Sequence, residues 1–189
     1  MNYDKDIAAA IEVLRKGGVI LYPTDTVWGI GCDATNSDAV KRIYAIKQRS
    51  DAKALITLVG SELALERTVA NVPEVAWQLI EAAVEPVTIV YDHSYSVAPE
   101  LLAEDGSLGV RLTREDFSMQ LCQRLRRPLV STSANISGTP TPHCFSEISP
   151  EILEQVDYVC TSRRKEPPAS KPSMVIKIKD DGQFRILRK

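Results

Sequence analysis

Two cations at one end of an expected helix are the first residues of this chain that could bind an anionic substrate. Lys47 and Arg49 flank a single residue, and Lys53 adds a third cation nearby. An arginine offers a planar fork of donors to phosphate oxygens, whereas a lysine offers a compact point charge. The same cations could instead offset the helix dipole and bond the last carbonyl groups of the helix. Their spacing leaves both interpretations open.

A row of small polar side chains is the second candidate. Ser131, Ser133, Asn135 and Ser137 alternate along the chain, so a continuous strand would place all four on one face. On that face they could bond phosphate or ribose oxygens. A polar turn ending at Gly138, in which Ser and Asn bond their own backbone, explains the same residues equally well.

Regular elements must position these groups, and apolar periodicity locates the elements along the chain. Thr24, Asp25 and Thr26 follow the first expected strand, and ligands bind at strand ends in open α/β folds. The alternation of helices and strands predicts a single α/β domain with a mixed sheet. Strands are expected over 19–22, 55–59, 88–91, 108–112, 128–130, 158–160, 175–178 and 184–187, and helices over 7–14, from Ser37 to 47–49, from Ser61, from Pro73, over 115–127 and over 148–156.

Several of these elements carry more specific expectations. Ser37 is expected to cap its helix, and the strand over 108–112 has an alternating character. The helix over 148–156 contains Pro150 and is expected to be interrupted there. An Asp-Gly pair at 181–182 signals a hairpin between the last two strands. The polar stretch over 161–171 is expected to be a mobile loop that could serve as a partial lid.

Composition limits the kinds of ligand. The 189 residues carry a formal net charge of −2, so an anion site must be a local cluster of cations. The four cysteines form no CxxC pattern, and we expect no metal site through cysteine or histidine. GxxxxGK[ST] and GxGxxG segments are absent. His93 and His143 lie in no triad motif and are expected at the surface, while Trp28 could line a pocket.

Hydropathy places the protein in an aqueous compartment. No apolar run approaches the roughly 20 residues that a membrane span needs, and the first residues lack the apolar core of a signal peptide. We expect a soluble cytoplasmic protein without a membrane partner.

Five ordered segments together resemble the YrdC/YciO family of L-threonylcarbamoyladenylate synthases. They are PTDTVWGIGCDA, IKQRSDAKALI, SLGVRL, PLVSTSANISG, and KPSMVI with ILRK, and they span nearly the whole chain. The resemblance implies a twisted mixed α/β sheet with flanking helices around a large concave cavity. It also implies one domain over 1–189, without the additional C-terminal domain of longer relatives.

The same resemblance implies an activity and a set of site residues. The enzymes of this family make an adenylate from ATP, L-threonine and bicarbonate and release pyrophosphate, and Mg²⁺ is expected to arrive with the ATP. The family pattern places the catalytic tetrad at Lys47, Arg49, Ser133 and Asn135. It places ATP at these four residues and at Ser107, Ser131 and Arg188, and it places threonine at Thr24, Arg111 and Ser173.

The implied product feeds N6-threonylcarbamoyladenosine modification of tRNA, so a downstream threonylcarbamoyl transferase complex and tRNA are expected partners. Two alternatives remain open at this point. The first is a YciO-like paralogue with another acceptor, because Glu85 to Thr88 and the Ser173-Met174 pair depart from the usual threonine-site pattern. The second is a non-catalytic module that binds double-stranded RNA or tRNA.

Overall fold

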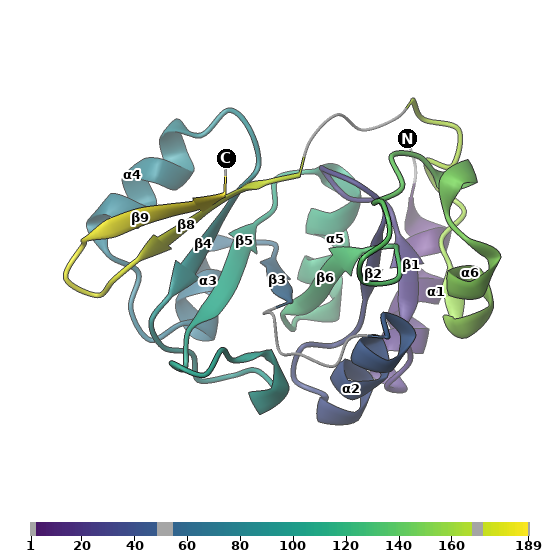
Figure 1. The fold of residues 1–189 in the computed structure, drawn as a ribbon, viewed down its shortest axis with the longest axis horizontal. Helices are drawn as coiled ribbons and strands as arrows, with labels where there is room; N and C mark the ends of the chain where they lie inside the picture. The colour runs from purple at the N-terminus through teal and green to yellow at the C-terminus, as the bar shows by residue number, and fades with distance from the viewer. Residues whose placement is uncertain (1–2, 49–54, 168–171, 189) are drawn as a thin grey trace.

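Strands and helices alternate along the computed structural model, which describes residues 3–48, 55–167 and 172–188 (Figure 1). The strands are β1 Ile20–Tyr22, β2 Gly29–Gly31, β3 Ile56–Val59, β4 Val87–Tyr91, β5 Leu108–Leu112, β6 Leu129–Ser133, β7 Tyr158–Val159, β8 Met174–Ile178 and β9 Phe184–Arg188. The helices are α1 Asp4–Arg15, α2 Ser37–Ile46, α3 Glu62–Thr68, α4 Glu74–Ala82, α5 Asp116–Leu125 and α6 Pro150–Gln155, with short 3₁₀ turns at Pro99–Leu101 and Phe145–Glu147.

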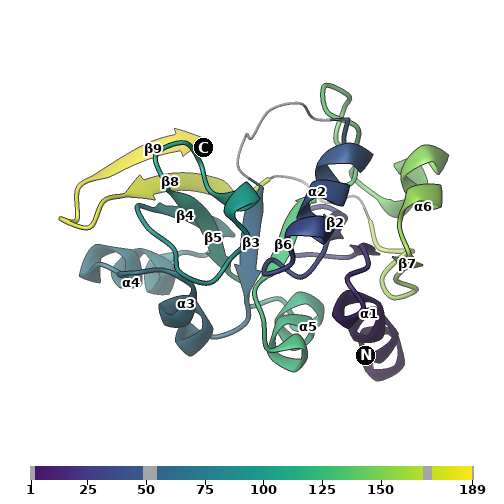
Figure 2. The same ribbon diagram turned by 90° about the horizontal axis from the view of Figure 1, so that it is seen from below.

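The described strands form one mixed sheet in the order β7-β1-β2-β6-β3-β5-β4-β8-β9. β6 lies at the centre of the region that matters here, because it pairs antiparallel with both β2 and β3. β3 pairs parallel with β5, and β4 pairs parallel with β8. Figure 2 shows α4, α3, α5 and α1 in a row along one face of the sheet, with α2 on the opposite side near β2 and β6. The expected mixed α/β fold is confirmed.

The helices pack through apolar faces that the sequence pattern predicts. In α1, Ile7, Ala10, Ile11 and Leu14 are buried, and the helix packs against α5. Gly17 ends the helix region with a φ of 80°, a conformation that glycine adopts without steric cost. Among the described residues, no helix is both long and apolar enough to cross a lipid bilayer.

Most expected elements are confirmed, and the exceptions have local physical causes. Asn36, not Ser37, caps α2, because its side chain accepts a hydrogen bond from the backbone N–H of Ala39. Pro150 begins α6 and does not interrupt it, since a proline fits the first turn of a helix, where its missing N–H costs nothing. Helix α5 ends at Leu125, earlier than expected, because Arg126 adopts a left-handed conformation with a φ of 59°.

Two strands differ from the expectation in a way that bears on the site. The short strand β2 was not expected at all, because two of its three residues are glycines, which are depleted in strands. It pairs with both β1 and β6, and only glycine fits at position 31, since an added Cβ would lie 2.6 Å from the carbonyl oxygen of Val130. β5 does not alternate between buried and exposed residues, since Leu108 to Arg111 are all buried. A strand that is covered on both faces has no solvent-exposed face, so its sequence need not alternate between apolar and polar residues.

One buried carboxylate ties the C-terminal part of the described chain to α1. Asp6 is 6% exposed, and it accepts hydrogen bonds from the hydroxyl of Tyr158 and the backbone N–H groups of Thr161 and Ser162 at 2.6 to 3.0 Å. Burial raises the pKa of Asp6, but these hydrogen bonds outweigh it and leave the pKa below its ordinary value. The charged form of Asp6 therefore stabilises the folded protein at neutral pH.

We predict that Asp6→Asn lowers the free energy of unfolding by about 1–3 kcal/mol at pH 7, because an amide cannot accept all of these bonds. A group with a lowered folded pKa contributes stability above its unfolded pKa and loses it as the pH falls through the folded value. The difference between the wild type and the variant should therefore shrink below about pH 4.

Urea denaturation from pH 7 down to pH 3 measures this difference. Asp38→Asn, at an exposed position in the first turn of α2, is the matched control and should change stability by less than about 0.5 kcal/mol. A difference for Asp6→Asn that stays constant over the whole pH range would contradict the assigned role.

Candidate functional site

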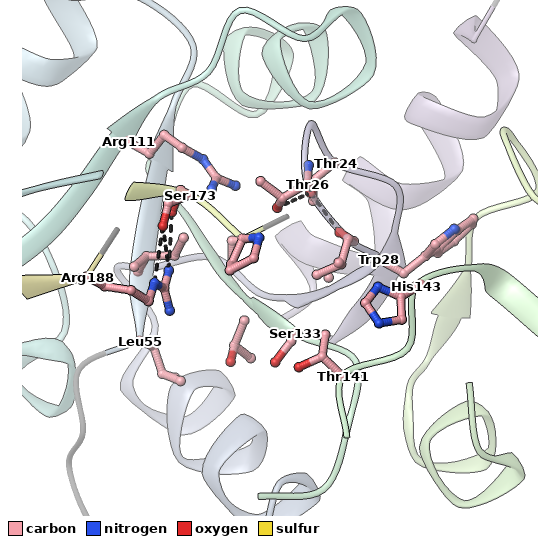
Figure 3. A pocket seen from close by; sticks show the side chains of 16 residues that line it. Thr24, Thr26, Trp28, Leu55, Arg111, Ser133, Thr141, His143, Ser173 and Arg188 are labelled. Atoms are coloured by element: carbon pink, nitrogen blue, oxygen red, sulfur yellow. Dashed lines mark hydrogen bonds between the residues drawn. The ribbon is translucent and has the colours of Figure 1, made fainter. Parts of the chain in front are cut away.

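A cavity of about 360 Å³ lies where the loop after β1 meets β6, β3, β5 and the β8–β9 hairpin (Figure 3). Its walls are unusually rich in hydroxyl groups for a space at the centre of a sheet. Two guanidinium groups, an indole ring and an imidazole ring also reach it. The polar and aromatic side chains that line it are Thr24, Thr26, Trp28, Arg111, Ser131, Thr132, Ser133, Thr141, His143, Ser173 and Arg188.

The loop after β1 presents its threonines to the cavity because it is closed by its own side chains. The hydroxyl of Thr24 donates to the carbonyl oxygen of Val27 at 2.7 Å and accepts from the backbone N–H of Thr26 at 3.1 Å. Gly29 then lets the loop approach β6, since an added Cβ would lie 3.2 Å from both Ser131 and Thr24. The loop is thus a rigid wall of the cavity.

Arg111 brings a buried positive charge to the cavity from β5. Its side chain is 2% exposed, and its Nη2 lies 2.9 Å from Oδ1 of Asp25. This contact is short but poorly aligned, because neither Asp25 Oδ1 nor Arg111 Nε has a hydrogen-bond partner in the described structure. Burial raises the pKa of Asp25 above its ordinary value, and the nearby charge of Arg111 only partly offsets this. Arg111 therefore lines the cavity with a guanidinium group whose buried Nε has no partner in the described structure.

Arg188 and Ser173 reach the cavity from the two strands of one hairpin. The Nε and Nη2 atoms of Arg188 donate to the carbonyl oxygen of Ser173 at 3.1 and 2.9 Å. The hydroxyl of Ser173 lies 2.9 Å from that of Thr88 on β4. Burial lowers the pKa of Arg188, and the charge of Arg111 lowers it further. A bound anion would relieve this repulsion between two guanidinium groups.

Lys47 joins the end of α2 to the end of β6. It is 3% exposed, and its Nζ donates to the carbonyl oxygens of Ser133 and Asn135 at 2.6 and 2.8 Å. Its own carbonyl oxygen accepts from the backbone N–H of Ser137. The ammonium group therefore holds the polar turn that follows β6.

The row of small polar side chains is part strand and part turn. β6 ends at Ser133, so Ser131 and Ser133 both reach the cavity while the following residues turn away. Asn135 accepts from the hydroxyl of Ser133 at 2.5 Å and donates to the carbonyl oxygen of Thr139 at 2.8 Å. The first half of the segment is therefore strand and the second half is a polar turn, and a single strand through Ser137 is wrong.

The structure brings most of the expected site residues together. Two of them, Lys47 and Asn135, adjoin the cavity through the turn after β6 but do not line it. Ser107 precedes β5, donates to Asp105 at 2.6 Å, and does not line the cavity either. Arg49 lies outside the described residues. The expected residues that line the cavity are Thr24, Arg111, Ser131, Ser133, Ser173 and Arg188.

Trp28 lines the cavity while being only 6% exposed, as its position in a polar loop suggested. Two other lining residues carry no sequence signal for a site. His143 is exposed as expected, yet it also lines the cavity. Thr141 reaches the wall from the same irregular segment. No motif surrounds Thr141 or His143, and only the path of the chain after the turn places them here.

The expected lid is fixed where the structure describes it. Arg163 donates to the carbonyl oxygen of Thr24 at 3.2 Å and to Oε1 of Glu115 at 2.8 Å. Arg164 donates to the carbonyl oxygens of Val159 and Cys160. Arg163 therefore joins this segment to the cavity wall at Thr24, while the rest of the expected loop lies outside the described residues.

The fold and the cavity together define a class of protein. It is a mixed α/β domain whose cavity is lined by hydroxyl groups and two arginines, groups that are suited to small anionic molecules. Across residues 3–48, 55–167 and 172–188, no three His, Cys, Asp or Glu side chains gather in a way that could hold a metal ion.

The chain belongs to the Sua5/YciO/YrdC family. The model of that family, which is described as telomere recombination, matches residues 12–189. The threonylcarbamoyl-AMP synthase of Pseudoalteromonas translucida is 37% identical over 161 residues, which cover 84% of this chain and 86% of that relative. The resemblance found in the sequence is thereby confirmed.

Two solved structures share the fold. The structure of YciO from E. coli has a TM-score of 0.83 and 28% identity, covering 98% of this chain and 89% of that one. The structure of P. abyssi Sua5 complexed with L-threonine has a TM-score of 0.80 and 27% identity, covering 91% of this chain. This chain spans about half the length of that Sua5 protein, 50% of it being covered.

We predict that Lys47→Met lowers the free energy of unfolding by about 1–3 kcal/mol, because it removes the buried ammonium group that bonds the carbonyl oxygens of Ser133 and Asn135. Urea denaturation measures the loss. The matched control is Lys41→Met on the same helix, whose exposed ammonium pairs with Glu100 at 3.2 Å and should contribute less than about 1 kcal/mol. Equal stability of the two variants would contradict a buried role for Lys47.

Proposed function

We propose that this protein is a threonylcarbamoyl-AMP synthase that uses ATP, L-threonine and bicarbonate and releases pyrophosphate. One observation carries the proposal: Arg111 is almost fully buried beside the cavity, and its Nε has no partner in the described structure. Burying a guanidinium group with an unused donor is costly unless a ligand completes it. The carboxylate of an amino acid has the planar shape and charge that such a donor set prefers.

Relatives support the identity of that amino acid. The P. translucida relative is named threonylcarbamoyl-AMP synthase, and the similar Sua5 structure is complexed with L-threonine. In the proposed arrangement, Arg111 binds the threonine carboxylate, while Thr24 and Ser173 accept or donate hydrogen bonds to its polar groups. All three residues line the same cavity.

The nucleotide is proposed to lie toward β6 and Arg188. Ser131, Ser133 and Arg188 line this part of the cavity, and Lys47 and Asn135 hold the turn beside it. Arg49 and Ser107 remain proposed ATP contacts by family pattern alone. The cavity wall supplies hydroxyl groups and guanidinium groups, so Mg²⁺ belongs to the substrate, held by phosphate oxygens and water.

The proposed chemistry needs no nucleophile from the protein. The threonine nitrogen attacks the bicarbonate carbon and water leaves, which gives an N-carboxylate. An oxygen of that carboxylate then bonds to the α-phosphorus as the bond to the β-phosphate oxygen breaks and pyrophosphate departs. The protein contributes positioning and fixed positive charge near the crowded oxygens. The product is a substrate for a transferase that acts on a tRNA adenosine.

A YciO-like enzyme with another acceptor is the second candidate, because the E. coli YciO structure is as similar in fold as Sua5. The two candidates differ in the amino acid that they require.

We predict that the purified protein releases pyrophosphate from ATP only when L-threonine and bicarbonate are both present. A coupled pyrophosphate assay with single omissions and an amino-acid panel measures this. Release with another amino acid, but not with threonine, would favour the YciO-like candidate. The absence of release with every acceptor would contradict both.

We also predict that Arg111→Met raises the KM for threonine by about 10²-fold, a typical cost of removing one charge-stabilising donor. The KM for ATP should change far less. Arg114→Met is the matched control, since Arg114 is an exposed arginine three positions further along the chain. Equal KM values for threonine in the two variants would rule out the proposed carboxylate site.

A further inference from the structure

The partner of Arg111 has no role in the chemistry described so far. Asp25 lies between two threonines that line the cavity, Thr24 and Thr26, but Asp25 itself does not line it. Asp25 instead lines a second hollow of about 190 Å³, formed by the end of α4, the start of β4, the end of β5 and the residues that precede α5. Asp25 therefore belongs to the second hollow, while its partner Arg111 lines the substrate cavity.

The charges around Asp25 come from three different elements. Arg111 on β5 is the nearest, at 2.9 Å. Glu115, which caps α5, raises the pKa of Asp25, whereas Arg163 lowers it. Arg163 is itself paired with Glu115 at 2.8 Å and with Glu166 at 2.7 Å. Among the described residues, Asp25 is the carboxylate that pairs with Arg111.

The energetic need for this counter-charge is greatest when the site is empty. A guanidinium group that is 98% buried loses most of its hydration, and an unpaired charge in that position is costly. Asp25 lies 2.9 Å from Nη2, in a contact that is not a well-aligned hydrogen bond. Arg111 also lines the substrate cavity, where a ligand carboxylate can make a straighter bond to the guanidinium group.

We propose that Asp25 is a positioning residue that holds the guanidinium group of Arg111 oriented for the substrate carboxylate, without touching the substrate. This inference rests on the proposed function, because it assigns the carboxylate of the amino-acid substrate to Arg111. A carboxylate placed behind the guanidinium group fixes its plane and leaves its cavity-facing donors free.

The first test is Asp25→Asn, which keeps the size of the side chain and removes its charge. We expect the KM for L-threonine to rise about 10-fold or more, with kcat within about threefold and the KM for ATP within about twofold of the wild type. Asp25→Glu, which retains the charge, should recover a large part of the loss. Glu81→Gln, an exposed glutamate on α4, removes the same charge from the surface and should leave all three values unchanged.

A double-mutant cycle separates positioning through Arg111 from a general structural effect. In an Arg111→Met background, Asp25→Asn should not raise the threonine KM further, because its only route of action is gone. The melting temperature should also rise from the single variant Arg111→Met to the double variant, since the second change neutralises an orphaned buried carboxylate. A further rise in KM in the double variant would overturn the proposal.

The cycle also distinguishes failure of this inference from failure of the proposed function. Suppose that the wild type shows threonine-dependent pyrophosphate release and that Asp25→Asn has a threonine KM equal to or lower than that of the wild type. Only the positioning role of Asp25 is then overturned. A lowered KM would mean that Asp25 competes with the substrate for Arg111. If the wild type shows no threonine-dependent release, the proposed function fails. The melting temperatures then test the contact between Asp25 and Arg111 alone. A higher melting temperature in the double variant than in Arg111→Met supports this contact, and an equal or lower one overturns it.

Discussion

A single buried ammonium group fixes the geometry on which this cavity depends. Lys47 ends α2 and donates to two carbonyl oxygens of the turn that follows β6. β6 in turn pairs with β2 on one side and β3 on the other, so its position fixes the positions of both neighbouring strands. The hydroxyl groups of Ser131 and Ser133 acquire fixed positions because the strand and its turn are held at both ends.

Positive charge is concentrated locally in a protein that is slightly acidic as a whole. The net charge of −2 conceals two guanidinium groups that face the same cavity. Burial lowers the pKa of Arg188, and the nearby charge of Arg111 lowers it further. Low-dielectric walls focus the field of such a pair into the space between them. The domain can therefore attract a small multiply charged substrate without a basic surface that would bind any polyanion.

Local patterns predicted the elements well, and long-range contacts account for what they missed. Apolar periodicity located α1, α5 and most strands, because burial of one helical face is visible in sequence order. The strand β2 was missed because Gly29 and Gly31 have low strand propensity. Both are glycines because they pack closely against β6, where a side chain would be crowded. Six expected site residues line one cavity. The pairing of Asp25 with Arg111, and the place of His143, depend on distant segments meeting and leave no local pattern.

The β8–β9 hairpin links two site residues through strand register. Ser173 directly precedes β8, and Arg188 ends β9. Val175 pairs with Arg188, and a register shift between Val175 and Ile176 sets the offset between Ser173 and Arg188 along the hairpin. Side chains alternate between faces along a strand, so a slip of one residue would turn the Arg188 guanidinium to the opposite side of the sheet. Among relatives, the length of the 179–183 turn should accordingly vary less than the exposed side chains Phe184, Ile186 and Leu187. The outer edge of this domain can diverge in composition while its spacing stays constant.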